Sequence, residues 1–81
     1  MNLTDLYKGL DRLKCDYTVD NSEVVTVKYR PLYQATYLTI ATVYKNRQFV
    51  FSVTVDIEQH PRADEVLTLL TEFSDTPVEE R

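Results

Sequence analysis

The stretch Ala35–Ile57 reads ATYLTIATVYKNRQFVFSVTVDI and decides the fold of this chain. Its two halves are rich in Val, Ile, Thr, Tyr and Phe, which suit the pleated, half-buried surface of a β-sheet. Lys45 and Asn46 separate the halves, and Asn tolerates the positive φ that a tight turn demands. The stretch therefore predicts an antiparallel hairpin with a two-residue loop.

A loop of this length fixes which residues of the two strands pair. The apolar pattern supports the same register, because a slip of one residue would move every side chain of a strand to the other face. In the predicted register, three residue pairs share one face, and all of their members except Thr42 are apolar. The predicted pairs are Leu38 with Val53, Ile40 with Phe51, and Thr42 with Phe49.

Residues 24–30 predict another strand, because apolar and polar side chains alternate along it. Residues 17–19 are extended enough to add a short fourth strand beside residues 24–27. Pairing residues 24–30 with the hairpin aligns the apolar faces again. The aligned pairs are Val25 with Ile40 and Val27 with Leu38.

Two amphipathic helices flank the strands, over residues 2–14 and 61–73, because apolar side chains recur in both at helical spacing. Asn2 is a plausible N-cap, and Asp5 stands where a capping box has its acid. Gly9 lies inside the first helix and costs about 1 kcal/mol relative to Ala. We expect this glycine to be simply tolerated; close helix packing is the alternative.

These elements predict an α+β fold of the order α-β-β-β-α, in which a three-stranded antiparallel meander carries two helices on one face. Residues 1–75 form a single domain, and residues 76–81 are expected to be a frayed C-terminal tail. The predicted core is Leu3, Leu6, Leu10, Leu13, Val25, Val27, Tyr29, Leu38, Ile40, Phe49, Phe51, Val53, Val55, Val66, Leu67, Leu70 and Phe73.

The composition narrows the classes of function. The chain has 81 residues, a formal net charge of −4 and one cysteine. A mildly acidic chain is not typical of proteins that bind nucleic acid or anionic membranes. A single cysteine excludes an internal disulfide, and the sequence shows no signal-peptide core and no long apolar span. We therefore expect a cytoplasmic protein.

The sequence offers few groups for catalysis or ligand binding. Cys15 and His60 are its single cysteine and histidine, and we expect a core residue and a loop residue rather than a nucleophile with its base. No metal-ligand spacing occurs, and one glycine cannot form a phosphate-binding loop. We predict no catalytic residues, no cofactor, no metal and no small-molecule substrate, and hence a protein that is not an enzyme.

The order of the elements resembles that of the double-stranded-RNA-binding domain. The resemblance implies a Gly-Pro-containing loop between the first two strands and a basic start to the last helix. Here the corresponding segments are Arg30–Gln34 and His60–Glu65, which lack the basic signature. RNA binding needs clustered positive charge along the phosphates, so only the topology of this family is expected.

A second resemblance is local and covers roughly the first quarter of the chain. The segments MNxxDL at residues 1–6 and DYTV at residues 16–19 look like the opening of small acidic phage-encoded anti-CRISPR proteins that inhibit Cas9. The resemblance implies a helix–three strands–helix order and acidic residues that mimic DNA, with Asp16 at one acidic position. The acidic hairpin loop of that family is replaced here by residues 31–33 and 45–47.

Two functional hypotheses follow. The first is a small protein-interaction module of phage or bacterial origin, which self-associates through its sheet or binds a protein partner there. The second is an inhibitor that blocks a basic nucleic-acid-binding surface of a host protein. Acidic residues gathered on one rim of the sheet would favour the inhibitor. These residues are Asp16, Asp20, Glu23, Asp56 and Glu58.

The first hypothesis depends on surfaces that the chain leaves uncovered. The strand at residues 47–57 would be a sheet edge without proline or lysine in its centre, and such edges recruit other strands. Both helices are needed on one sheet face, so the other face stays open to a partner. The candidate interaction surface on that face is Tyr37, Thr39, Ala41, Val43, Val50, Ser52 and Thr54.

Overall fold

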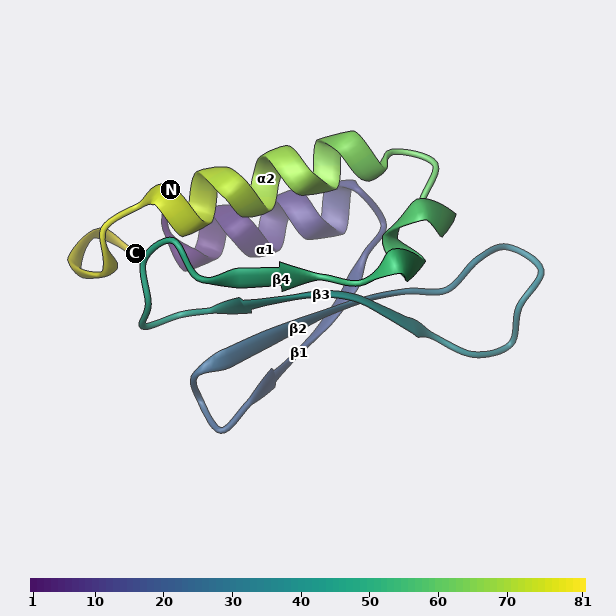
Figure 1. The fold of residues 1–81 in the computed structure, drawn as a ribbon, viewed down its shortest axis with the longest axis horizontal. Coiled ribbons are helices and arrows are strands. Elements are labelled where there is room, and N and C mark those ends of the chain that lie inside the picture. Colours follow the sequence, from purple (N-terminus) through teal and green to yellow (C-terminus); the bar gives the residue numbers. More distant parts are fainter.

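The computed structural model describes residues 1–81 as two layers, with both helices on one face of an antiparallel sheet (Figure 1). This arrangement confirms the predicted α+β fold class. No helix combines the length and the apolar character needed to cross a membrane. The elements are α1 (Leu3–Arg12), β1 (Asp16–Asp20), β2 (Val24–Tyr29), β3 (Leu38–Tyr44), β4 (Phe51–Val53), the 3-10 helix η1 (Val55–Gln59), α2 (Ala63–Asp75) and the 3-10 helix η2 (Val78–Glu80).

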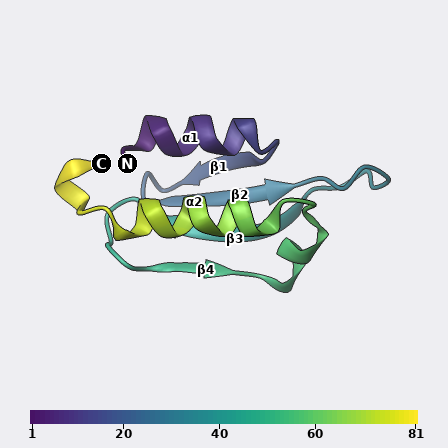
Figure 2. The same cartoon turned by 90° about the horizontal axis from the view of Figure 1, so that it is seen from above.

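The sheet is a meander of four strands in the order β1-β2-β3-β4. The added strand is β1, which lies beside β2 and pairs Tyr17 with Val27. The ring of Tyr17 stacks on that of Tyr7 from α1, with the two centroids 4.6 Å apart. The chain therefore has one strand more than the three-stranded prediction, and β1 and β4 form the two edges of the sheet (Figure 2).

The predicted register between β3 and β4 is wrong. The structure pairs Val43 with Phe51 and Ala41 with Val53, because the connection is longer than the two-residue turn at Lys45 and Asn46. The positive φ falls on Phe49, at 66°, and not on Asn46. The extra residues let the connection reach the C-terminal end of α2. There the Phe49 N–H donates to the Ser74 carbonyl at 2.8 Å.

A second shift separates the predicted and observed pairing of β2 with β3. Val27 lies opposite Ala41, whereas the next pair is Lys28 with Thr39, so Ile40 has no partner of its own. An extra residue of this kind is a β-bulge, which lets two successive side chains face the same side. Ile40 and Ala41 are accordingly both fully buried. The predicted pairs Val25–Ile40 and Val27–Leu38 are therefore wrong.

The strand predicted over residues 47–57 is shorter in the structure, where β4 covers Phe51–Val53 alone. The Thr54 N–H still donates to the Ile40 carbonyl at 3.0 Å, and the chain then winds into η1. This turn buries Ile57 and leaves Val55 75% exposed. Val55 is therefore not a core residue, because the extended conformation ends before it.

Helix α1 begins as predicted, with a complete capping box. The Asp5 N–H donates to Asn2 Oδ1 at 2.8 Å, and the Asn2 N–H donates to Asp5 Oδ2 at 3.3 Å. Gly9 faces α2, and a Cβ atom added there would lie 2.7 Å from Leu69 Cδ1. The glycine thus serves close helix packing, the alternative to simple tolerance.

Helix α2 turns most of the predicted face to the core, but Leu69 is buried in place of Leu67. Its buried side chains include Val66, Leu69, Leu70 and Phe73, whereas Leu67 is 38% exposed. The helix contacts both the sheet and α1. Figure 2 shows the two helices side by side over the sheet, and Leu69 lies against Gly9.

The predicted core holds for most positions and fails in β4 and α2. Nine of its members are buried: Leu6, Leu10, Leu13, Val25, Val27, Ile40, Val66, Leu70 and Phe73. Half-buried members are Leu3, Tyr29, Leu38 and Phe51. Four members are exposed and were predicted wrongly, because of the register, the early end of β4 and the orientation of α2. They are Phe49, Val53, Val55 and Leu67.

Arg81 ties the C-terminal residues to the domain, in contrast to the frayed tail expected for residues 76–81. Its guanidinium lies 4.4 Å from the centroid of the Phe73 ring. Burial lowers the pKa of this guanidinium. The guanidinium donates hydrogen bonds to carbonyl groups at the end of α2 and in the β3–β4 connection. The accepting carbonyl oxygens are those of Tyr44, Lys45, Arg47, Ser74 and Thr76, at 2.8–3.1 Å.

We expect Gly9→Ala to have opposite effects in two backgrounds. In the native background, overpacking against Leu69 costs about 1–3 kcal/mol, which outweighs or cancels the helix-propensity gain of about 1 kcal/mol. With Leu69→Ala present, the same change should stabilise the protein by about 1 kcal/mol, since only the propensity gain remains. Urea unfolding of the four proteins measures both effects. Equal stabilisation in both backgrounds would contradict close packing at Gly9.

Arg81→Ala should lower the free energy of unfolding by about 1–3 kcal/mol, as expected for the loss of several hydrogen bonds from a charged donor. Arg81→Lys should recover less than half of this loss, because an ammonium group cannot reproduce the planar fork of a guanidinium. Urea unfolding compares the three proteins. Variants with the stability of the wild type would show that the tail contributes nothing.

Candidate interaction surface

The sheet face opposite the helices is uncovered (Figure 1). It carries a row of hydroxyl groups. Thr18 pairs with Thr26, Thr26 with Thr42, and Thr42 with Ser52, so the row crosses all four strands. The hydroxyls of Thr42 and Ser52 are hydrogen-bonded at 2.6 Å, and Thr26 Oγ1 donates to Asp20 Oδ2 at 2.9 Å. The face is therefore polar and partly satisfied by its own hydrogen bonds.

The seven residues of the predicted surface do not lie together. Ala41 and Val43 are fully buried beneath the helices, so their assignment to the outer face is wrong. The longer β3–β4 connection and the bulge at Ile40 place them on the core side. The remaining five are exposed: Tyr37, Thr39, Val50, Ser52 and Thr54.

These five residues occupy separate positions along the sheet. Ser52 belongs to the hydroxyl row. Thr54 Oγ1 donates to the Thr39 carbonyl at 2.7 Å, which joins β3 to the residue that follows β4. Val50 precedes β4 and is 40% exposed, and Tyr37 lies in the connection between β2 and β3. These five residues lie along the margin of the sheet and do not form one continuous face.

The margin along β4 is apolar and exposed. We name residues 48–55 the β4 edge; no charged residue occurs in this segment. Four of its apolar side chains are exposed, namely Phe49 at 68%, Val50 at 40%, Val53 at 38% and Val55 at 75%. No strand lies on the far side of β4, because β4 ends the sheet order. This segment combines unpaired backbone groups with exposed apolar side chains.

The connection between β2 and β3 forms a second exposed group, although the sequence predicts no more than a connector there. Figure 1 shows this loop projecting beyond the helices. Leu32 is 85% exposed and Tyr33 95% exposed. The guanidinium of Arg30 lies 5.7 Å from the ring centroid of Tyr37. We name Arg30–Tyr37 the loop surface; large apolar residues within a connection were the sequence signal for it.

Cys15 and His60 both contact the carbonyl oxygen of Leu13, at the end of the first helix. Cys15 Sγ lies 3.9 Å from it and His60 Nε2 lies 2.8 Å from it. The other ring nitrogen, Nδ1, accepts from the Arg62 N–H at 2.9 Å. His60 is therefore bound by the backbone at both nitrogens, with the proton on Nε2. It joins the end of α1 to the start of α2.

Cys15 lies in the wrong environment for a nucleophile. Burial, and secondarily the negative charge of Asp16, raise the pKa of its thiol from 9.0 to about 11. A reactive cysteine needs the opposite shift, because the thiolate is the nucleophile. Of the two side chains considered as a reactive pair, His60 thus links two helices and Cys15 is a buried core residue.

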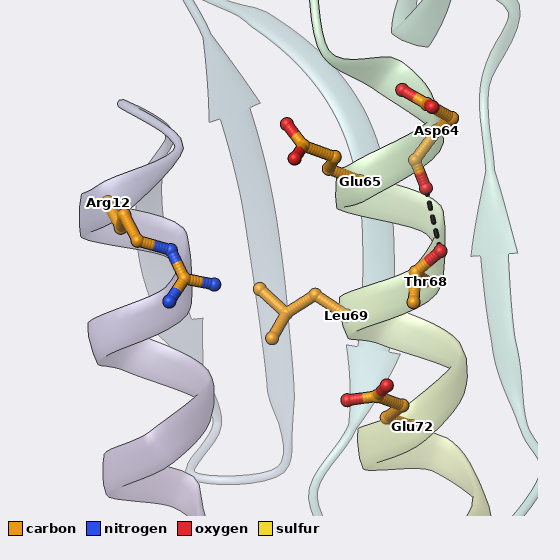
Figure 3. A pocket seen from close by; sticks show the side chains of 6 residues that line it. All are labelled: Arg12, Asp64, Glu65, Thr68, Leu69 and Glu72. Carbon is orange, nitrogen blue, oxygen red and sulfur yellow. Dashed lines mark hydrogen bonds between the residues drawn. The ribbon is translucent and has the colours of Figure 1, made fainter.

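A shallow cavity of about 250 Å³ lies between the two helices (Figure 3). Arg12 reaches into it from α1, opposite Glu65 and Glu72 of α2, and Leu69 forms its apolar wall. Glu65 is already engaged in an ion pair with Arg62, which lowers the pKa of its carboxyl. No cluster of three or more His, Cys, Asp or Glu side chains is placed to hold a metal ion.

The five acidic residues whose clustering would favour an inhibitor do not share one rim. Asp16 and Asp20 belong to β1, whereas Asp56 and Glu58 belong to η1, which follows β4. β1 and β4 are the two opposite edges of the sheet. Glu23 lies in the turn between β1 and β2.

Comparisons with protein-family models, with curated proteins and with solved structures found no match. The resemblances to double-stranded-RNA-binding domains and to anti-CRISPR proteins stay predictions.

The raised pKa of Cys15 predicts an unreactive thiol and a defined pH dependence. The unfolded chain loses this proton near pH 9 and the folded chain near pH 11. The stabilisation from the neutral thiol is therefore complete below pH 9 and is lost as the pH rises to 11. The difference in unfolding free energy between wild type and Cys15→Ser should fall across this interval.

Labelling of Cys15 by a maleimide at pH 8 should be slow in the native protein and fast in urea. Thr18→Cys, at an exposed position of β1, is the matched control and should label rapidly without denaturant. Fast labelling of native Cys15 would contradict its structural role.

Proposed function

We propose that this chain is a non-enzymatic protein-interaction module that self-associates through its sheet. The observation that carries the proposal is the β4 edge, where exposed Phe and Val side chains lie in and beside an edge strand that has no neighbour on its outer side. No charged residue occurs in this segment. Soluble proteins usually protect such an edge with charge, proline or a bulge. An unprotected apolar edge is explained most simply by a partner that covers it.

The absence of catalysis is part of this proposal, and the surroundings of Cys15 and His60 support it. Both ring nitrogens of His60 are used by backbone groups, and the Cys15 thiol is buried with a raised pKa. Neither group is free to act as a base or a nucleophile. We also place the protein in the cytoplasm of a phage-infected or bacterial cell, on the basis of its single cysteine and its local resemblance.

The alternative, an inhibitor that mimics nucleic acid, receives less support. Mimicry of a phosphate track requires carboxylates spaced along one surface. Asp16 and Asp20 lie on one edge of the sheet, and Asp56 and Glu58 follow the strand at the other. At the helix cavity, Glu65 is already paired with Arg62, and Arg12 lies opposite Glu72.

Sedimentation equilibrium tests the proposed function. The wild type should form dimers at high micromolar concentration. The double variant Val50→Lys with Thr54→Lys should raise the dissociation constant by more than about tenfold, since burying an ammonium group in an apolar contact is costly. The double variant Leu32→Ser with Tyr33→Ser changes the loop surface instead and should leave the association unchanged.

A wild type that stays monomeric at every concentration would overturn self-association. Dimers that persist in the Val50→Lys, Thr54→Lys variant would show that the contact does not lie at the sheet. Dimers that are lost in the Leu32→Ser, Tyr33→Ser variant would show the same. Each variant should keep the circular dichroism spectrum of the wild type, which controls for unfolding.

A further inference from the structure

The open edge of the sheet indicates how a second copy binds, an inference that rests on the proposed function. We propose that two copies pair through β4 in antiparallel orientation, with the two-fold axis at Ser52. Such a dimer would join the two four-stranded sheets into one continuous sheet. Contacts of this kind are isologous, because the same strand serves on both sides.

The hydrogen-bonding pattern of β4 leaves the required groups free. In an antiparallel pair, alternate residues direct their N–H and C=O groups toward the neighbouring strand. The Thr54 N–H donates to the Ile40 carbonyl of β3, so Ser52 also directs its backbone groups to β3. Phe51 and Val53 therefore direct theirs away from the sheet. A two-fold axis at Ser52 pairs Phe51 of each copy with Val53 of the other.

The side chains agree with this pairing. Phe51 and Val53 lie opposite Val43 and Ala41, on the helix side of the sheet. In the dimer, Phe51 of one copy would therefore contact Val53 of the other on that side. Ser52 of both copies would meet on the opposite face, where it extends the hydroxyl row of the four strands.

The charges at the two ends of the β4 edge are complementary. Lys45 and Arg47 precede the segment, whereas Asp56 and Glu58 follow it. Antiparallel pairing brings the basic end of one copy beside the acidic end of the other. Complementary charges of this kind favour the correct orientation and register of an interface. Parallel pairing would instead bring like charges together.

The other edge strand, β1, carries charges that oppose self-pairing. β1 begins with Asp16 and ends with Asp20. If two copies paired through β1 about its central residue, Thr18, Asp16 of each copy would lie opposite Asp20 of the other. Like charges directly opposite one another destabilise a strand pair. The molecule thus protects β1 against self-pairing and leaves β4 unprotected, which identifies β4 as the dimer edge.

Disulfide trapping tests this geometry. Across the new pair, the two Ser52 residues form a non-hydrogen-bonded pair, whose Cα atoms lie about 4.5 Å apart, within disulfide range. Ser52→Cys should therefore form a covalent dimer under mild oxidation at high micromolar concentration. Thr18→Cys, at the centre of β1, is the matched control and should cross-link at least about tenfold more slowly, because like charges oppose that contact. The wild type, with only the buried Cys15, shows the background.

A second pair of variants tests the edge without a cross-link. Val53 and Val19 are edge-strand valines of similar exposure, 38% and 42%. Val53→Lys should abolish dimers in sedimentation, whereas Val19→Lys should leave them intact. Equal cross-linking of Ser52→Cys and Thr18→Cys, no cross-link from Ser52→Cys, or dimers that persist in Val53→Lys would overturn the β4 pairing. In those cases a dimeric wild type would still support the proposed function, and a monomeric wild type would overturn both.

Discussion

The carbonyl groups at the C-terminal end of α2 need hydrogen-bond donors, and the rest of the structure depends on how this need is met. The β3–β4 connection supplies the Phe49 N–H to the Ser74 carbonyl and the Gln48 side chain to the Asp75 carbonyl. The guanidinium of Arg81 donates to the carbonyl groups of Ser74 and Thr76 at the same helix end. A two-residue turn could not reach this helix end. The longer connection sets the register of β4, and that register decides which side chains face the core.

The elements that depend on local pattern could be predicted, and those that depend on tertiary contacts could not. The capping box of Asn2 and Asp5 and the alternation along β2 are encoded within a few residues. The sequence of the β3–β4 connection contains a valid tight turn, but nothing local indicates that helix capping would override it. The local sequence also gives no signal for the bulge at Ile40, because two successive apolar residues occur in ordinary strands too.

The prediction of the candidate interaction surface was partly wrong for the same reason, namely the unforeseen register of β4. With the shift in register, Ala41 and Val43 moved into the core, and Val53 moved to an exposed position of the margin. The prediction that β4 is an uncovered edge did not depend on the register, since it followed from the order of the strands alone. The loop surface could have been found from the sequence, because Leu32 and Tyr33 are large apolar residues in a connection that no helix was left to cover.

The polarity of the outer sheet face distinguishes it from the margin as a site of association. Along its centre, the hydroxyl groups of Thr42 and Ser52 bond to each other, and Thr26 bonds to Asp20. Covering these groups would remove water from polar atoms and gain little apolar contact. At the β4 edge, by contrast, unpaired backbone groups lie next to exposed Phe and Val side chains. A second strand there would satisfy the backbone and bury apolar surface at once, so the proposed association would be more favourable at the edge than on the face.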